Sequence, residues 1–175
     1  FESNAPMTAV YEGEEAPNGE SIAAAGYDAN NGVVYALENS GKLYRYSGIN
    51  PQSGKLTGRT QVATVAGADG INEMAFNNAD GQLYAISGAA NLMTVDVNTG
   101  AVTEIGQFGS GVVAMDFDSN GTLWIVDLYG ALCSVNLNTG AITQVAETGI
   151  SALAGQNFYS QSGCLFENTF YWAAI

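Results

Sequence analysis

The segment DFDSNGTLWIVD, residues 116–127, contains the side chains whose spacing comes closest to a metal site. Asp116, Asp118 and Asn120 occupy alternate positions ahead of a glycine, and Asp127 follows at the twelfth position, as in a calcium-binding loop. Calcium prefers such clusters of carboxylate and amide oxygens. If the chain binds a metal, we expect calcium, with Asp116 and Asp118 as the principal ligands and Asn120 as an auxiliary one.

The same segment also has a purely structural interpretation. A calcium loop of this kind normally follows a helix and ends in a bidentate glutamate. Here the residues cross a predicted β-hairpin, which carries Asp127 about 20 Å along a strand at ~3.3 Å per residue. Ser119, Asn120 and Gly121 are turn residues, and the related turns NNG and ADG lack the aspartate pair. Turn formation and calcium binding therefore remain as alternatives.

Other catalytic chemistry is restricted by what the sequence lacks. It contains no histidine, which removes the commonest general base and the commonest metal ligand. We expect the acidic run with Glu12, Glu14, Glu15 and Glu20 to be a solvated linker. Catalysis by paired carboxylates requires separations fixed at about 5 to 10 Å, and nothing in this run fixes them. We therefore assign no catalytic residue, and no cofactor apart from the calcium considered above.

Charge and composition restrict the partners and the location. The net charge is −13, and the only four basic residues lie between Lys42 and Arg59. Binding to nucleic acid phosphates requires many more Lys and Arg side chains. No apolar run approaches the ~18 to 20 residues of a membrane helix, so we expect no membrane insertion. Residues 60–175 contain no site for trypsin, which suits an extracellular, secreted or cell-surface protein.

Two stretches of the chain repeat one another almost position for position. Residues 70–109 are GINEMAFNNADGQLYAISGAANLMTVDVNTGAVTEIGQFG, and residues 111–149 are GVVAMDFDSNGTLWIVDLYGALCSVNLNTGAITQVAETG. The turn glycines Gly81 and Gly121 are 40 residues apart, and the later NTG glycines keep the same spacing. An earlier copy begins near residue 20 and has a longer third connection, through Pro51.

Each copy contains four short β-like runs separated by turn signals. In residues 70–109 the runs are NEMAF, QLYAIS, NLMTVDV and AVTEIGQ. The first connections (NNADG, DSNG, DANNG) and the third (NTG) are rich in Asn, Asp and Gly, which supply the positive φ angles of hairpin turns. Four strands in about 40 residues predict one blade of an all-β propeller. A β-sandwich is the alternative, because regularly spaced strands alone would suit it.

The repeat boundaries predict the organisation of the chain. We expect blades at about residues 20–69, 70–110 and 111–149, and a partial blade at 150–175. Residues 1–19 are expected to form an orphan outer strand and an acidic linker. The chain is then part of a larger propeller, closes on itself through its N-terminal strand, or shares a ring with another chain. An open arc exposes blade faces and a strand edge, which favours a homo-oligomer or flanking domains.

Aromatic residues recur in the predicted second strands. They are Tyr35, Tyr84, Trp124, Tyr171 and Trp172. We expect them to pack between blades, and the alternative is a stacking platform for a sugar.

Cys133 and Cys164 fall in neighbouring blades, at positions that need not approach within the ~4 to 7 Å of a disulfide. We expect two buried thiols.

The runs TGAVTEIGQ, TGAITQVAE, GQLYAIS and FYWAAI resemble the propeller repeats of large secreted or surface-anchored bacterial proteins, in the broad YncE-like and quinoprotein-like superfamily. The resemblance covers residues 20–175. It implies a binding or scaffolding module and no shared active site. The tryptophan-rich signature of the quinone-dependent enzymes is absent, with only Trp124 and Trp172 present.

These observations favour a non-enzymatic secreted or surface propeller that binds protein or carbohydrate. One alternative is a carboxylate- or metal-dependent polysaccharide hydrolase or lyase, which would need Asp116, Asp118 and Asp127 to converge. The other alternative is a set of structural spacer blades in a larger surface protein. The sequence does not identify the ligand, and fold analogy alone is weak evidence for function.

Overall fold

The computed structural model describes residues 21–52, 55–68, 70–151, 162–167 and 169–173. The orphan strand and acidic linker expected at residues 1–19 lie outside these residues. All of the regular structure in the described residues consists of β-strands. They contain no helix long and apolar enough to cross a membrane.

The strands form three four-stranded antiparallel sheets and one hairpin, and each sheet keeps its strands in chain order. Blade 1 contains β1 (Ile22–Asp28), β2 (Val33–Glu38), β3 (Lys42–Ile49) and β4 (Leu56–Thr64). Blade 2 contains β5 (Ile71–Asn77), β6 (Gln82–Ser87), β7 (Asn91–Val95) and β8 (Val102–Gln107). Blade 3 contains β9 (Val112–Phe117), β10 (Leu123–Asp127), β11 (Ala131–Val135) and β12 (Ile142–Glu147). The last hairpin contains β13 (Ser162–Phe166) and β14 (Thr169–Ala173).

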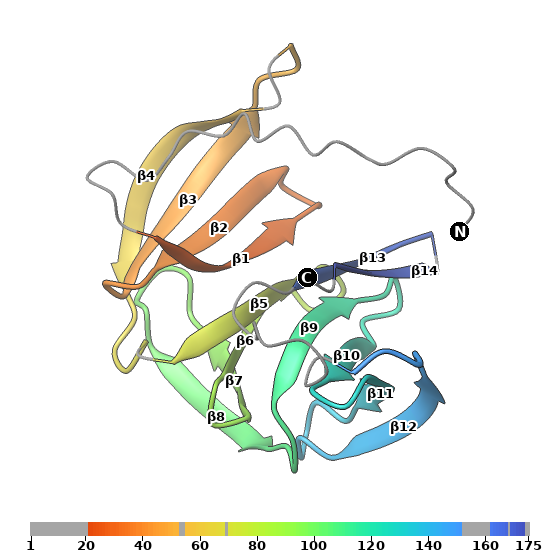
Figure 1. Cartoon of the computed structure of the whole chain (residues 1–175). Helices are drawn as coiled ribbons and strands as arrows, with labels where there is room; N and C mark the ends of the chain where they lie inside the picture. The colour runs from red at the N-terminus through yellow and green to blue at the C-terminus, as the bar shows by residue number, and fades with distance from the viewer. Residues whose placement is uncertain (1–20, 53–54, 69, 152–161, 168, 174–175) are drawn as a thin grey trace.

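The sheets follow one another around an arc (Figure 1). The first strands of consecutive sheets contact one another, β1 with β5, β5 with β9, and β9 with β13. The fourth strands β4, β8 and β12 lie at the periphery (Figure 1). This radial arrangement is a β-propeller, and it confirms the predicted fold class. The β-sandwich alternative is wrong, because the sheets are successive blades and not two facing layers.

Burial changes from the inner strand to the outer strand of each blade. In the inner strand β9, five of six residues are buried, whereas all six residues of the outer strand β12 are exposed. An inner strand lies between the blades on both sides, so both of its faces are apolar, as in any sheet covered on both faces. The contrast between VVAMDF and ITQVAE in the sequence therefore follows from radial position.

The core consists of separate layers between consecutive blades. Tyr35 of blade 1 stacks on Phe76 of blade 2, with ring centroids 5.8 Å apart and an interplanar angle of 17°. Tyr84 of blade 2 lies against Phe117 of blade 3, with centroids 5.0 Å apart. Both tyrosines are buried. The expectation that second-strand aromatic residues pack between blades is confirmed for these two.

The NTG turns bring the outer parts of neighbouring blades together. Gly100 has a φ of 74°, in the left-handed region where glycine is favoured. A Cβ on Gly100 would lie 2.2 Å from the carbonyl oxygen of Thr64 in β4. The third connection therefore needs glycine both for its backbone conformation and for its contact with the preceding blade.

The two cysteines differ in their surroundings. Both are free thiols, and Cys133 is buried whereas Cys164 is exposed. The expectation of two buried thiols is therefore wrong for Cys164. The reason is its position on the side of β13 that faces away from blade 3, where no described blade covers it.

The close approach of β1 to β5 generates a prediction at Gly26. A Cβ at this position would lie 2.9 Å from Leu83 Cδ1 and 3.1 Å from the backbone nitrogen of Phe76. Because backbone cannot move aside as a side chain can, we expect Gly26→Val to lower the free energy of unfolding by about 1–3 kcal/mol. Urea denaturation followed by tryptophan fluorescence measures the change.

The matched control is Ala25→Val, because Ala25 is the exposed neighbour on the same strand. Ala25→Val should change the free energy of unfolding only slightly. Equal destabilisation by the two substitutions would contradict the proposed contact between β1 and β5.

Candidate functional site

The predicted calcium residues lie at the end of β9 and in the turn that leads to β10. Asp118 Oδ1 accepts hydrogen bonds from the backbone nitrogens of Asn120 and Thr122, each at 2.9 Å. Its Oδ2 accepts a hydrogen bond from the indole Nε1 of Trp124 at 3.1 Å. Burial acts to raise the pKa of Asp118, but the hydrogen bonds from Trp124, Thr122 and Asn120 outweigh it and hold the pKa below its usual value. The carboxylate therefore stays ionised and organises the turn.

The other blades place an equivalent side chain at the same position. Asp28 Oδ1 accepts a hydrogen bond from the backbone nitrogen of Asn31 at 3.0 Å. Asn77 Oδ1 accepts one from the backbone nitrogen of Ala79 at 3.0 Å. Asp and Asn side chains commonly close turns in this way. A comparison of the three repeats, each with Asp or Asn at the end of the first strand, could have indicated this role for Asp118.

Asp116 has a different role, which the sequence did not indicate. Its Oδ2 accepts a hydrogen bond from the backbone nitrogen of Leu165 in β13 at 2.7 Å, and its Oδ1 accepts one from the backbone nitrogen of Phe117 at 2.8 Å. Burial raises the pKa of Asp116 above its usual value, although both hydrogen bonds act to lower it. Gly26 and Ala75 occupy the equivalent positions in blades 1 and 2. The hydrogen bond of Asp116 with Leu165 therefore joins blade 3 to the last hairpin and has no equivalent on blades 1 and 2, where Gly and Ala stand at this position.

Asp127 lies at the opposite end of β10 from the turn. Its Oδ1 accepts hydrogen bonds from the backbone nitrogens of Tyr129 and Ala131, each at 2.9 Å. Ser110 Oγ donates to its Oδ2 at 3.3 Å. Asp127 therefore does not converge with the other two carboxylates. In the described part of the chain, no group of three or more His, Cys, Asp or Glu side chains could hold a metal ion.

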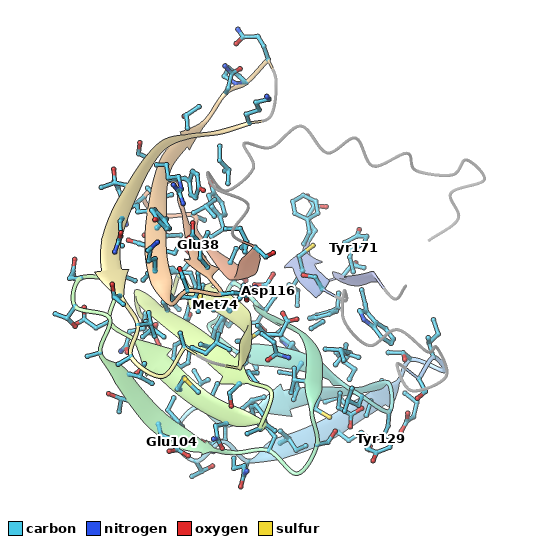
Figure 2. The ribbon with its side chains drawn as sticks, turned by 60° about the vertical axis from the view of Figure 1, so that its left-hand side comes forward. Glu38, Met74, Glu104, Asp116, Tyr129 and Tyr171 are labelled. Carbon is cyan, nitrogen blue, oxygen red and sulfur yellow. The ribbon has the colours of Figure 1, made fainter. Side chains whose placement is uncertain are left out.

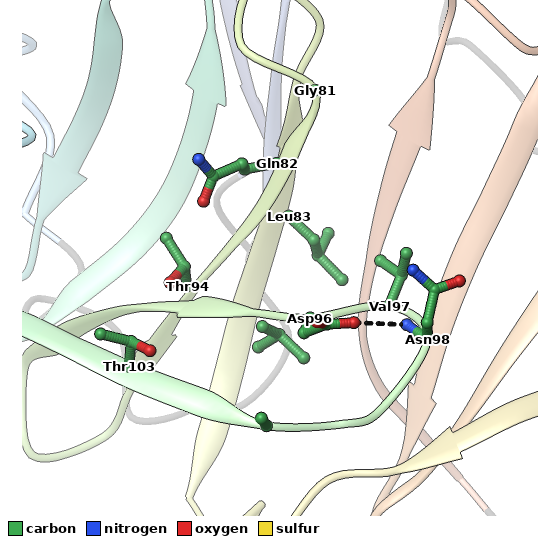
Figure 3. A pocket seen from close by; sticks show the side chains of 10 residues that line it. Gly81, Gln82, Leu83, Thr94, Asp96, Val97, Asn98 and Thr103 are labelled. Atoms are coloured by element: carbon green, nitrogen blue, oxygen red, sulfur yellow. Dashed lines mark hydrogen bonds between the residues drawn. The ribbon is translucent and has the colours of Figure 1, made fainter.

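A polar hollow of about 410 Å³ lies at the end of blade 2, beside the β5–β6 and β7–β8 turns (Figure 3). The apolar side chains of its lining are Leu83, Val95, Val97 and Ala101. The polar side chains around it are Gln82, Thr94, Asp96, Asn98 and Thr103. Sequence reasoning missed this site, because its residues belong to strand ends and turns whose chemistry is ordinary.

Asp96 gives the hollow its charge. Its Oδ1 accepts hydrogen bonds from the backbone nitrogens of Asn98 and Thr99, at 2.8 and 3.1 Å, and these bonds hold the pKa of Asp96 below its usual value. The carboxylate is therefore ionised and fixed in direction by the turn, and Figure 3 shows its bond to Asn98. The hollow combines one negative charge with neutral hydrogen-bonding groups and contains no aromatic ring.

Glu73 is a buried carboxyl group on the inner strand β5. The residue is 9% exposed, and burial raises the pKa of its carboxyl group to about 8. The protonated form is therefore favoured in the folded chain at neutral pH. Ile86 and Ala75 beside it belong to the apolar layer between blades 2 and 3, which explains the cost of charge at this position.

Comparisons with known proteins show the fold, and one family model matches part of the chain. A family model described as a domain of unknown function (DUF4394) matches residues 50–122, which contain β4, blade 2 and β9. This segment is less than half of the chain. No curated protein sequence matches the chain.

Three solved structures resemble the chain over most of its length. A Bacteroides thetaiotaomicron protein of unknown function is 14% identical, with a TM-score of 0.58 over 82% of this chain and 42% of its own. A chain in the nidogen/laminin complex is 10% identical, with a TM-score of 0.61 over 89% of this chain and 72% of its own. BamB from Moraxella catarrhalis is 17% identical, with a TM-score of 0.53 over 89% of this chain and 48% of its own.

At such low identity these similarities show the fold alone, and they support the β-propeller. The chain spans less than half the length of the Bacteroides protein and of BamB. Membership of the YncE-like and quinoprotein-like superfamily stays a prediction, because it is a finer statement than the propeller fold.

Glu73 generates a prediction about pH. Because the pKa is about 8 in the folded chain and about 4.5 in the unfolded chain, the folded state binds the proton more tightly. The contribution of the protonated Glu73 carboxyl group to stability is complete below pH ~4.5 and is lost as the pH rises through ~8. We expect the free energy of unfolding of Glu73→Gln to match that of the wild type near pH 4.5. At pH 9 it should be higher than that of the wild type by a few kcal/mol, because each pKa unit corresponds to about 1.4 kcal/mol.

Urea denaturation of both proteins at several pH values measures this difference. Glu104→Gln on the exposed outer strand β8 is the control for general charge effects. A gap between Glu73→Gln and wild type that stays constant with pH would show that Glu73 does not titrate differently on folding.

The calcium hypothesis for Asp116, Asp118 and Asn120 stays a prediction, and the geometry makes it testable. A calcium ion on Asp118 would have to compete with the hydrogen bond from Trp124 Nε1. Calcium binding should therefore shift the tryptophan fluorescence in a saturable way, and Asp118→Asn should abolish the shift. Magnesium at equal concentration controls for ionic strength. An unchanged spectrum at millimolar calcium would leave Asp118 with its role in the turn alone.

Proposed function

We propose that this chain is a non-enzymatic binding module and that a protein binds to it at the hollow in blade 2. The observation that carries the proposal is the polar lining of that hollow, in which Asp96 is ionised and held in place by its own turn. Gln82 and Asn98 beside it offer both hydrogen-bond donors and acceptors. A segment of a partner protein can satisfy such groups through its backbone and polar side chains.

The distribution of acids supports a binding role over the alternative of a hydrolase or lyase. Asp118 and Asp127 lie at opposite ends of β10, and each is occupied by backbone hydrogen bonds of its own turn. The sequence has no histidine to replace them as a base. Two carboxylates that serve different turns do not form an acid and base pair.

The burial of two second-strand tyrosines and the lining of the hollow favour a protein over a carbohydrate as the ligand. Tyr35 and Tyr84, which could have stacked on sugars, are 8% and 5% exposed because they pack between blades. The hollow itself contains no aromatic ring. One of the similar folds occurs in a nidogen/laminin complex, so a propeller of this kind is compatible with protein recognition, although fold similarity alone does not transfer a ligand.

An extracellular or cell-surface location belongs to the same proposal. The net charge of −13 favours solubility and disfavours nucleic acid as a partner. The absence of Lys and Arg from residues 60–175 removes every trypsin site from blades 2 and 3. Both features suit a binding module that works among proteases.

Ala101 provides the test of this proposal. Ala101 is exposed and lines the hollow, and Ala141 is exposed at the equivalent position of the NTG turn in blade 3. We expect Ala101→Trp to fill the hollow and to weaken partner binding at least tenfold, whereas Ala141→Trp leaves binding unchanged. The measurement is quantitative mass spectrometry of proteins retained from the extracellular fraction of the source cells.

A protein retained by wild type and by Ala141→Trp, but lost with Ala101→Trp, would support the hollow as the binding site. The same three proteins are applied to a glycan array. Glycan binding that Ala101→Trp abolishes would replace a protein ligand by a carbohydrate. No ligand sensitive to Ala101→Trp in either assay would favour structural spacer blades.

A further inference from the structure

The turn between β7 and β8 begins with an acid, whereas the same turn of blade 3 begins with an amide. Asp96 starts DVNTG in blade 2, and Asn136 starts NLNTG in blade 3. Asn136 Oδ1 accepts a hydrogen bond from the backbone nitrogen of Asn138 at 2.9 Å. Asp96 Oδ1 accepts the equivalent bond from Asn98 at 2.8 Å. A neutral amide therefore closes this kind of turn, and the turn itself does not require the charge of Asp96.

The carboxylate of Asp96 retains one oxygen for a ligand. Its Oδ1 accepts both backbone hydrogen bonds of the turn, and no described residue donates to its Oδ2. None of the described residues that line the hollow is basic, and no Lys or Arg follows Arg59 in the sequence. Other acids of this chain also lack a cationic neighbour. Asp96 differs from them because its charge lies in a hollow among hydrogen-bonding side chains.

These side chains lie along one side of blade 2. The strand register pairs Tyr84 with Thr94 and Thr94 with Thr103, so the two threonines share the side of the sheet on which Tyr84 lies. Gln82, two residues before Tyr84, lies on that side by strand alternation. Figure 3 shows Gln82, Thr94 and Thr103 on the same side of Asp96. The hollow therefore places amide and hydroxyl oxygens beside one carboxylate.

An arginine side chain fits this arrangement better than a lysine side chain. A guanidinium group has five N–H donors in one plane and no acceptor, so it can bind a carboxylate and still donate to neighbouring oxygens. A lysine ammonium group has three donors at one strongly hydrated point. The volume of about 410 Å³ lies within the range of clefts that take small ligands, about 300 to 1,000 Å³. The hollow thus has room for a whole side chain.

We propose that the hollow binds an arginine side chain of the partner protein, with its guanidinium group on Asp96 and on the oxygens of Gln82 and Thr94. This inference rests on the proposed function, because it names the group of the partner that enters the same hollow. The net charge of −13 attracts a basic partner at longer range. Asp96 is then the residue that selects the partner, and the rest of the turn holds it in position.

The test titrates the whole ¹⁵N-labelled chain with the peptide acetyl-Gly-Ser-Arg-Ser-Gly-amide and follows the backbone amides by nuclear magnetic resonance. The amides of Asn98 and Thr103 should shift in a saturable way, with a dissociation constant in the millimolar range. A peptide with citrulline, which has the shape of arginine but no charge, should bind about fivefold more weakly, as expected for the loss of one exposed ion pair. A lysine peptide should also bind more weakly than the arginine peptide.

Asp96→Asn should weaken binding of the arginine peptide by about fivefold. Because Asn136 closes the same turn in blade 3, this variant should keep the wild-type spectrum outside the hollow. The matched control is Glu104→Gln, which removes one charge from the outer strand β8 (Figure 2). Glu104 pairs with Met93 and does not line the hollow, so this variant should bind the peptide as the wild type does.

A spectrum that does not change, equal affinities for the arginine and citrulline peptides, or full affinity in Asp96→Asn would overturn the proposal. A lysine peptide that binds as tightly as the arginine peptide would also overturn it. The outcome is separate from that of the proposed function. A partner protein that is lost with Ala101→Trp but retained by Asp96→Asn would leave the hollow as a binding site and overturn the arginine alone. Peptide binding at Asp96, without any protein sensitive to Ala101→Trp, would support the arginine site and contradict the proposed function alone.

Discussion

Packing between the inner strands of consecutive blades is the constraint on which the rest of the structure depends. A single four-stranded blade has two apolar faces at its inner edge and cannot bury either alone. Tyr35 on Phe76 and Tyr84 on Phe117 show the repeated solution, in which each blade covers the next. Burial at the inner strands and exposure at the outer ones follow from this radial arrangement.

Much of the fold could be predicted from the sequence because the repeat displays it several times. The period fixed by Gly81 and Gly121, together with turn residues between short apolar runs, indicated the four-stranded blade. The packing role of Tyr35 and Tyr84 was also predictable, since an aromatic residue recurs at the same place in each copy. Cys164 was predicted wrongly, because its exposure depends on whether another blade follows, and a local pattern contains no such information.

The chemistry of the carboxylates was less accessible from the sequence. Asp118 resembled a metal ligand when its own segment was considered alone, but the equivalents Asp28 and Asn77 close turns in the other blades. The partner of Asp116 is the backbone of Leu165, 49 residues away, and nothing in the local sequence points to it. The hollow escaped prediction for a related reason, since its lining combines residues from two separate turns and their strands and contains no distinctive motif.

The hydrogen bond from Leu165 to Asp116 has a consequence for the way the molecule unfolds. In the part of the chain that the structure describes, this hydrogen bond and a small apolar cluster around Val113, Ala114 and Val126 join the last hairpin to blade 3. The layers between blades 1 and 2 and between blades 2 and 3 bury many more side chains. In a linear array of units that touch only their neighbours, a weakly coupled end opens before the centre does. Backbone amides of β13 and β14 should therefore exchange with solvent deuterium faster than those of β5 and β9, while the central blades remain closed.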